Sequence, residues 1–255
     1  MSAWLFDLGN TRLKCAPLDA DGSRGAAIAI SHRDTDLAAA MAQVLPTRIE
    51  VAYLASVARD ELRVAVLDAL AARCERISLA TTLPRFGGIT IGYPQPRQLG
   101  VDRFLAMLAA HADSHAAALV CGVGTALTID LLDRHGQHHG GLIAPSPTTM
   151  REALHARAPQ LPLHAGACRQ FADNTADALA GGCEGAALGL IERSLAAARS
   201  KLGELPTVHL HGGGADALLP QLPGARCSQD LVLDGIAIWA GAESRAGQVA
   251  TIQQC

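Results

Sequence analysis

Aromatic residues are scarce in this chain: they make up 3% of its 255 residues, whereas 49% of the residues are hydrophobic. A chain of this length and hydrophobicity can bury a sizeable core, but Ala, Leu, Val and Ile must build that core. These side chains favour many helices packed closely on sheets. The length allows one large domain or two modest ones.

Long blocks of one charge and long apolar runs are absent as well. The formal net charge is -3 at pH 7, so we expect neither nucleic acid nor a membrane surface as a partner, although local charges could bind a small anion. No uninterrupted apolar stretch is long enough to span a bilayer. The N-terminus lacks the basic region and long apolar run of a signal peptide. The sequence therefore predicts a soluble, cytoplasmic protein.

Paired cysteine motifs are also absent, because the seven cysteines are scattered, odd in number and never form a CxxC pair. This distribution argues against a zinc site and against a disulfide scaffold. We expect small buried hydrophobic residues in a reducing compartment. The seven are Cys15, Cys74, Cys121, Cys168, Cys183, Cys227 and Cys255.

The sequence does contain an order of elements that occurs twice. In each half, three apolar strands are followed by alternating helices and strands, which predicts mainly parallel sheets covered by helices on both faces. Ligands in such folds bind at the carboxyl ends of the strands. We expect two domains, residues 1–114 and 115–255, with the site in the cleft between them. The predicted strands are 5–8, 13–18, 26–30, 49–57, 75–79, 118–123, 125–132, 138–143, 208–210 and 231–233, and the predicted helices include 36–45, 60–73, 148–156, 175–202 and 235–246.

The first strand leads into a turn with the parts of a phosphate site. Asp7 ends the strand, Gly9, Asn10 and Thr11 form the turn, and Lys14 follows. A carboxylate at this place can hold hydrated Mg²⁺, the glycine permits close approach of a phosphate, and the other residues offer donors and a positive charge. An ordinary hairpin with an exposed lysine would show the same pattern, and we give both interpretations equal weight.

A second turn follows the apolar strand of residues 118–123. The backbone amides around Gly124 and Thr125 could hold further phosphates, and the glycines at 140–141 could let a ligand approach. A buried glycine-rich bend explains this turn equally well when it is considered alone. Because the two turns occupy equivalent places in the two halves, the nucleotide interpretation gains weight.

Gly100, Val101, Asp102 and Arg103 open an apolar helix. An aspartate at a helix N-terminus is expected from the helix dipole alone, and taken alone this is the more frequent explanation. If Asp102 faces a cleft, its carboxylate could accept a proton from a substrate hydroxyl. The planar guanidinium of Arg103 would suit a substrate carboxylate.

Histidines alternate on the strand that precedes the glycine turn of residues 212–214. His209 and His211 share one face and resemble a metal pair, but no third ligand is close in sequence, so we favour a structural role. The neighbours His138 and His139 point to opposite faces of a strand. The glycine turn could let an adenine or ribose lie against the backbone, or it could be a plain strand-to-helix turn.

Taken together, these motifs resemble the type III pantothenate kinases, and the resemblance spans nearly the whole chain. Each motif alone is weak, but their combination and order are specific. The residues that carry the resemblance are Asp7-Leu8-Gly9-Asn10-Thr11-Arg12-Leu13-Lys14, Gly100-Val101-Asp102-Arg103, Gly124-Thr125-Ala126-Leu127-Thr128-Ile129-Asp130, Gly140-Gly141-Leu142-Ile143-Ala144-Pro145, Asn174-Thr175-Ala176-Asp177-Ala178 and Gly212-Gly213-Gly214.

The resemblance implies a duplicated ribonuclease H-like (actin-like ATPase) α/β fold, with two mixed sheets flanked by helices. It implies a homodimer that uses ATP and Mg²⁺ to phosphorylate pantothenate at its primary hydroxyl, the first step toward coenzyme A. Asp102 would be the catalytic base. The resemblance further implies that Asp7, Gly9, Asn10, Thr11, Lys14, Gly124, Thr125 and Gly213 bind ATP, that Asp7 holds Mg²⁺ through water, and that Tyr93, Gly100, Val101, Asp102, Arg103 and Thr175 bind pantothenate.

The chain departs from the family at Gly122. Members often carry an aspartate there, two residues before the glycine of Gly-Thr-Ala, which helps to bind a monovalent cation such as K⁺ or NH₄⁺. Here the position is glycine and Cys121 precedes it. The Pro-Gly that often closes the Gly-Gly strand is also changed, to Pro145-Ser146. Either the cation is not required, or another group substitutes for it, or catalysis is weaker.

Two other functions fit the same motifs. One is a kinase or phosphatase of the same superfamily that acts on another small molecule. The other is a nucleotide-binding regulator that has lost catalysis, for which Gly122 is the best argument. Retention of both Asp7 and Asp102 argues against the regulator, because a protein that only binds ATP has less need of a base.

Overall fold

The computed structural model describes residues 2–32 and 36–252, with side chains to residue 243, and the chain divides into two compact units. The first comprises Met1–Ile89, Tyr93–Ala112 and Asp230–Cys255, and the second comprises Thr90–Gly92 and Asp113–Gln229. This division differs from the expected split after residue 114. The last helix packs with the first unit, because its apolar face lies against strands of the first sheet.

The first unit contains a five-stranded mixed sheet in the order β3-β2-β1-β4-β5. The three leading strands are antiparallel neighbours, and β4 and β5 add to the sheet in parallel. Its strands are β1 (Ala3–Leu8), β2 (Arg12–Leu18), β3 (Ile28–Ser31), β4 (Ile49–Ser56) and β5 (Cys74–Leu79), and its helices are α1 (Leu37–Val44), α2 (Asp60–Ala71), α3 (Val101–Ser114) and α7 (Leu231–Ile252). A short 3₁₀ turn, Pro96–Gln98, precedes α3.

The second unit repeats this plan with the strand order β10-β9-β8-β11-β12. Its three leading strands are again antiparallel neighbours, and the other two are again parallel additions. The repeated topology agrees with the duplication predicted from the element order. The elements are β8 (Ala118–Val123), β9 (Ala126–Leu132), β10 (His138–Pro145), β11 (Thr207–His211), β12 (Arg226–Cys227), α4 (Pro147–Arg157), α5 (Thr175–Leu202), α6 (Ala215–Leu218) and the 3₁₀ turn Leu219–Gln221.

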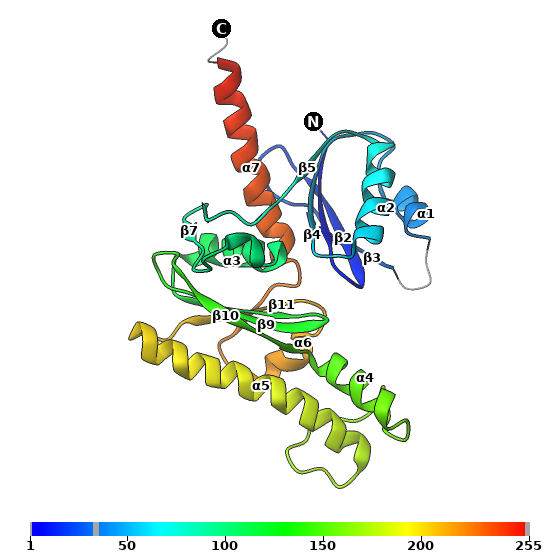
Figure 1. Ribbon diagram of the computed structural model, residues 1–255, viewed down its shortest axis with the longest axis vertical. Coiled ribbons are helices and arrows are strands. Elements are labelled where there is room, and N and C mark those ends of the chain that lie inside the picture. Colours follow the sequence, from blue (N-terminus) through cyan, green and yellow to red (C-terminus); the bar gives the residue numbers. More distant parts are fainter. Residues whose placement is uncertain (1, 33–35, 253–255) are drawn as a thin grey trace. The chain divides into compact units, whose positions relative to one another are not determined.

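Local sequence signals explain where the longest helix of the second unit begins and ends. The side chain of Asn174 accepts a hydrogen bond from the backbone N–H of Asp177, which satisfies a free donor of the first turn of α5. The helix ends at Gly203, whose φ of 73° lies in the left-handed region that glycine adopts without strain. Between these ends α5 runs along the sheet of its unit and contacts β8 and β9 (Figure 1).

Each unit has its own apolar core. Leu5, Phe6 and Leu8 of β1 are fully buried in the first unit. Strand β8 is buried along its whole length in the second. The scarcity of aromatics leaves a single described cluster of three rings, in which Phe86 and Phe104 pack with Trp239. Small and branched side chains fill most of both cores, as the composition predicted.

The structure also contradicts or extends several expectations. The predicted strand at residues 231–233 is wrong, because these residues begin α7. The short strands β6 (Arg85–Phe86) and β7 (Ile89–Thr90), and also β12 and α6, were not predicted.

The six described cysteines are free, and three of them, Cys15, Cys121 and Cys183, are buried. Cys255 lies outside the described residues. Among the helices of residues 2–32 and 36–252, none is long and apolar enough to cross a membrane.

Candidate functional site

The first predicted phosphate turn joins β1 to β2. Asp7 lies directly opposite Lys14 in the antiparallel pairing of these strands. The backbone N–H of Gly9 donates a hydrogen bond to the carbonyl of Arg12 (3.1 Å), which closes the turn. Asn10 is exposed at its tip. The sequence thus places a carboxylate and an ammonium group side by side at the carboxyl end of the first strand.

Lys14 has a partner that the sequence did not indicate. Its Nζ lies 3.0 Å from a carboxylate oxygen of Asp230, just before α7. Arg24 extends the network, with Nε donating to Asp234 (2.6 Å) and a second guanidinium nitrogen 3.6 Å from Asp230. Because Asp230 is 216 residues from Lys14 in sequence, no local pattern could have identified it. The network holds the lysine beside the first turn.

The surroundings of Asp7, near the end of β1, shift its pKa far from the ordinary value of an aspartate. Burial raises the pKa of Asp7 most, and the negative charges of Asp102 and Asp230 add to the rise while Lys14 opposes it, so that the pKa lies at about 7. The pKa shift shows that Asp102, 95 residues later in the chain, lies close enough to repel Asp7. Two carboxylates predicted independently from sequence therefore lie near each other at one end of the first sheet.

This pair fits a magnesium ion. Mg²⁺ usually keeps several waters and uses one or two protein carboxylates, and a cation would relieve the repulsion that raises the pKa of Asp7. No group of three or more His, Cys, Asp or Glu side chains that could form a larger cage occurs in the described part of the chain. A water-mediated site at Asp7 is consistent with both observations.

Asp102 lies in the first turn of α3, and its neighbours in sequence explain its position. Its Oδ1 accepts a hydrogen bond from the backbone N–H of Arg103 (2.8 Å). A Cβ atom on Gly100 would lie 2.5 Å from the same oxygen, so a side chain there would push the carboxylate away. Thr82 fixes the preceding segment by donating to the carbonyl of Leu99 (2.8 Å). The predicted glycine therefore makes room for the carboxylate.

Arg103 is buried, with 6% of its surface exposed, although an isolated arginine would be expected at the surface. Two of its guanidinium nitrogens lie 3.5 Å from the hydroxyl of Tyr93, and its Cζ lies 6.0 Å from the centre of that ring. Both residues were predicted to bind the substrate. The structure brings them together beside Asp102 in the first unit.

The second predicted phosphate turn lies between β8 and β9 of the second unit. The backbone N–H of Gly124 donates to the carbonyl of Ala126 (2.9 Å). The hydroxyl of Thr149, from α4, donates to the carbonyl of Thr125 (2.6 Å) and holds the turn from the other side. The role of Thr149 was not predicted, and no motif in the sequence signalled it.

The glycine turn of residues 212–214 packs directly against this second turn. Gly212 has a φ of 88°, and a Cβ atom there would lie 2.6 Å from the carbonyl oxygen of Val123. The backbone N–H of Gly214 donates to the same carbonyl (2.9 Å). The predicted contact residues Gly124 and Gly213 are thus on neighbouring backbone segments of the second unit.

The remaining predicted residue, Thr175, is the first residue of α5. The segment before it is tied to the helix, since Asp177 accepts a hydrogen bond from the N–H of Ala167 (2.8 Å) and pairs with Arg169 (3.1 Å). This hydrogen bond, together with one from Asn174 and the charge of Arg169, lowers the pKa of Asp177. The start of α5 is therefore well defined, and Thr175 lies in the second unit.

The predicted histidines do not form a metal site in the described residues. His209 is buried, and this burial lowers its pKa, with smaller effects of Asp113 and Arg226. Nε2 of His138 lies 3.0 Å from the carboxylate of Asp130 in the interior of the sheet. His209 and His138 therefore have structural roles in the second sheet.

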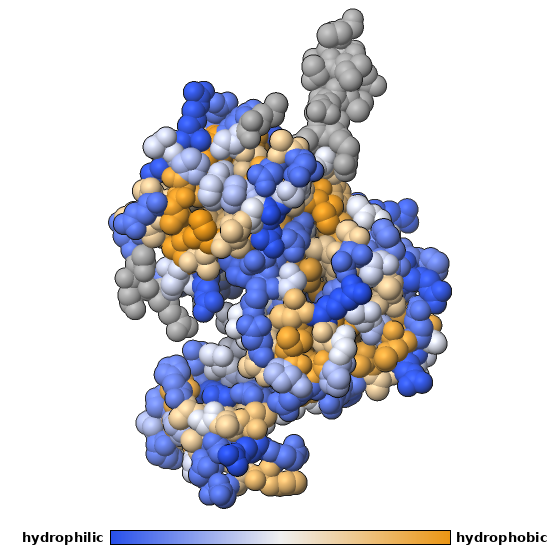
Figure 2. Space-filling view, turned by 180° about the vertical axis from the view of Figure 1, so that it is seen from behind, coloured by the Kyte–Doolittle hydropathy of each residue, from blue (hydrophilic) through white to orange (hydrophobic). Residues whose placement is uncertain are grey.

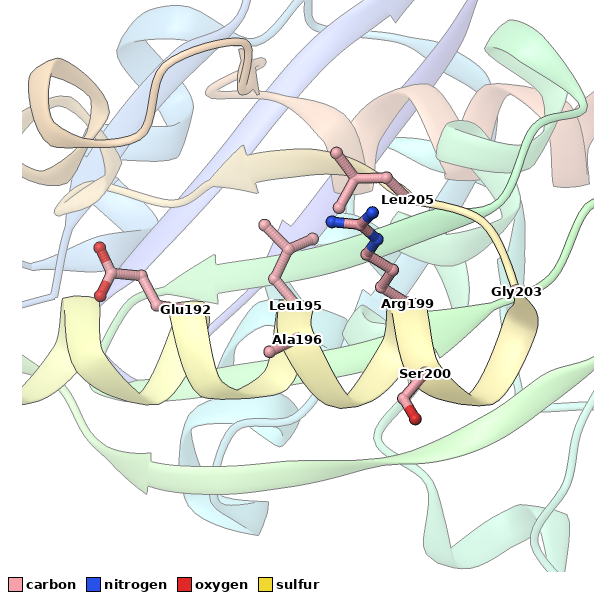
Figure 3. Close-up of a pocket in the computed structure, with 7 residues that line it drawn as sticks. All are labelled: Glu192, Leu195, Ala196, Arg199, Ser200, Gly203 and Leu205. Atoms are coloured by element: carbon pink, nitrogen blue, oxygen red, sulfur yellow. The ribbon is translucent and has the colours of Figure 1, made fainter.

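A pocket of about 530 Å³ lies along the C-terminal part of α5, and no predicted site residue lines it. Leu195, Arg199 and Leu205 line it, and their side chains lie on the same side of the helix (Figure 3). A second pocket of about 470 Å³ lies between the end of β10, α4 and α5, and apolar residues such as Met150 and Leu154 line it. Neither pocket contains a residue of the phosphate turns.

Comparisons with known proteins identify the family. A model of the type III pantothenate kinases matches residues 4–197. The type III pantothenate kinase of Stenotrophomonas maltophilia (strain R551-3) is 54% identical over 240 residues, which cover 94% of this chain and 98% of that protein. The corresponding protein of Xanthomonas campestris pv. campestris (strain B100) is 53% identical over 241 residues, with the same coverage.

Solved structures support the fold at lower identity. A Baf family transcriptional activator from Campylobacter jejuni superposes with a TM-score of 0.60 at 20% identity, covering 94% of this chain and 99% of that chain. A 2-dehydro-3-deoxygalactonokinase protein from Sinorhizobium meliloti gives 0.56 at 16% identity, covering 95% and 98%. These similarities show the duplicated actin-like α/β fold. Because the family model and the relatives both span most of its length, the chain belongs to the type III pantothenate kinases.

Proposed function

We propose that this protein transfers a phosphoryl group from ATP to the primary hydroxyl of pantothenate, the first step of coenzyme A biosynthesis. The observation that supports this proposal most directly is the proximity of Asp7 and Asp102 at one end of the first sheet, where the charge of Asp102 raises the pKa of Asp7. Family membership and nearly complete coverage of the relatives point to the same reaction. Catalysis of phosphoryl transfer mainly requires the protein to position the reactants and to stabilise charge.

Asp102 acts as the catalytic base in this proposal. Its carboxylate orients the pantothenate hydroxyl and accepts its proton as the oxygen attacks phosphorus. Arg103 binds the pantothenate carboxylate, because a buried guanidinium offers several fixed donors to that group. Tyr93, whose hydroxyl lies near Arg103, completes this part of the substrate site. The assignment of Thr175 to the same site comes from the family resemblance.

The ATP phosphates are bound by the two glycine turns in this proposal. In the first unit, Gly9, Asn10 and Thr11 offer backbone and side-chain donors, and Lys14 offers a positive charge held by Asp230. In the second unit, Gly124, Thr125 and Gly213 bind the phosphates. Magnesium, when bound near Asp7, neutralises developing charge on the transferred group. Mg²⁺ and a proton compete for the Asp7 carboxylate, and the raised pKa of about 7 favours the proton in this competition as the pH falls below neutral.

A coupled assay of ADP release tests the proposal. The purified protein should release ADP when it is given ATP, Mg²⁺ and pantothenate, and phosphopantothenate should accumulate in equal amount. Parallel reactions with other small hydroxyl compounds separate pantothenate from the alternative of a different kinase substrate. Binding of ATP without turnover on any acceptor would instead support the alternative of a nucleotide-binding regulator.

The resemblance also leads us to propose a homodimer located in the cytoplasm. Leu142 and Ile143 on the edge strand β10 are 47% and 67% exposed, which is unusual for large apolar side chains. Apolar side chains gather in patches among polar ones on the face seen in Figure 2. Light scattering coupled to size exclusion measures the mass directly, and Ile143→Lys should lower it toward one chain of 26.4 kDa if β10 forms the interface.

A further inference from the structure

Three residues meet across neighbouring strands at the base of the second phosphate turn. Gly122 of β8 pairs with Thr128 of β9 on one side and with His211 of β11 on the other. Val123, the next residue of β8, accepts the hydrogen bond from Gly214. The three residues therefore lie where both glycine turns of the second unit start.

The side chains of the two neighbours close over the glycine. A Cβ atom on Gly122 would lie 2.7 Å from Oγ1 of Thr128, 2.8 Å from Nε2 of His211 and 3.0 Å from Cε1 of the same ring. Contacts this short require the neighbouring side chains to move. The imidazole of His211 thus occupies the space that any side chain at position 122 would need.

This arrangement does not fit the monovalent cation that the family resemblance implies. Hard cations prefer oxygen ligands, and the family position for a carboxylate is here covered by an imidazole. The neighbouring carboxylate on the same face of β9, Asp130, is buried and engaged by His138 at 3.0 Å. The polar groups that close over position 122 are a threonine hydroxyl and a ring nitrogen.

We propose that His211 replaces the cation site of the second phosphate turn, so that this protein needs neither K⁺ nor NH₄⁺. The imidazole N–H of His211 contacts the nucleotide phosphates at this turn, and Gly122 is required because it leaves room for the ring. This inference rests on the proposed kinase function for its rate measurements, but ATP binding tests it independently.

A double-mutant cycle tests the inference with wild type, His211→Thr, Gly122→Asp and the double variant. Threonine is chosen because it suits a strand. ADP release and calorimetric ATP affinity are measured in K⁺, NH₄⁺ and tetramethylammonium chloride at equal ionic strength. Wild type should differ by less than about twofold among the salts, and His211→Thr should lose roughly tenfold in ATP affinity in all of them, the size of one hydrogen bond to a charged group.

The double variant should gain a response of ATP binding to K⁺ that wild type lacks. With a carboxylate at 122 and the ring removed, K⁺ should strengthen ATP binding by about tenfold over tetramethylammonium. Gly122→Asp alone should not gain this response, because His211 still fills the space. Circular dichroism checks that each variant is folded, and wild type alone suffices for the salt comparison if a variant is not.

Two results would overturn the inference: strong activation of wild-type ATP binding by K⁺ or NH₄⁺, or unchanged ATP affinity in folded His211→Thr. Failure of the proposed function has a different signature, namely ATP binding without turnover in every salt. In that case the affinities still decide whether His211 replaces the cation site.

Discussion

The two units share one strand order but differ in charge at corresponding strand ends. In the first, Asp7 stands between Lys14 of β2 and Ala55 of β4. In the second, the corresponding residue Gly122 stands between a threonine and a histidine. The duplicated framework fixes where a side chain stands but not its charge. In the proposed reaction, the first turn therefore holds a metal near the base Asp102 of α3, and the second turn is a largely neutral phosphate contact.

The largest expected effect concerns the base of the first unit. Asp102→Asn should lower kcat by roughly 10²-fold or more, in the range of general-base contributions, because an amide cannot accept the hydroxyl proton. The matched control is Asp60→Asn, which changes another first-turn aspartate on the exposed helix α2. Near wild-type kcat in correctly folded Asp102→Asn would exclude Asp102 as the base.

The second prediction compares the two turns directly. Asp7→Asn should lower turnover by about 10²-fold, since the carboxylate that would hold the Mg²⁺ charge partner of the transition state is lost, whereas Thr125→Ala should cost about tenfold or less, the size of one hydrogen bond. Steady-state kinetics with ATP and pantothenate measures both. Equal losses in the two variants would show that the turns contribute alike and would remove the asymmetry.

The third prediction concerns the lysine of the first turn. Lys14→Ala should raise the KM for ATP by roughly tenfold, because one charge-assisted contact to phosphate is lost. The effect on KM should exceed the effect on kcat. Lys201→Ala, at the exposed end of α5, is the matched control. If the ATP kinetics of Lys14→Ala match those of the control, the first turn does not bind phosphate through this residue.

The smallest effect is on stability and concerns pH. The pKa of Asp7 is raised from 3.8 to about 7 in the folded protein, so the folded state retains a proton that the unfolded state loses. Stability therefore falls as pH rises between these values. Asp7→Asn removes this loss of stability, because the amide does not ionise. At pH 8 without Mg²⁺ the variant should therefore melt at a higher temperature than wild type, by about 2–4 °C for each kcal/mol of unfolding free energy recovered.

Melting curves at pH 4 supply the comparison for that prediction, because the folded wild type then carries a neutral side chain at position 7, as the variant does, and the unfolded chain is only partly ionised there. The difference in melting temperature should shrink toward zero there. A difference that stays constant between pH 4 and pH 8 would mean that Asp7 is not the group that titrates.

Much of this site was predictable because its signals are local. The glycine turns follow apolar strands, and Asp102 follows a glycine at a helix start. The duplicated order also predicted which strand ends correspond. Contacts between distant segments were not predictable in the same way: nothing near Lys14 indicates Asp230, and nothing near Gly122 indicates that the ring of His211 covers it.

The wrong strand at residues 231–233 has a physical reason. Leu231, Val232 and Leu233 form a short apolar run that fits a buried strand as well as a buried helix. All three are buried in the structure, so the run predicted burial correctly and secondary structure incorrectly. The length of the following apolar segment decides for the helix.

Helix α7 gives the chain a particular order of assembly during synthesis. A Cβ atom on Gly235 would lie 2.1 Å from the backbone oxygen of Leu105, so α7 lies in backbone contact with the helix that carries Asp102. The ribosome makes α7 after the entire second unit. The first unit therefore gains its last helix only after the second unit has been made, and a nascent chain that stops before residue 230 lacks both the support of α3 and the partner of Lys14.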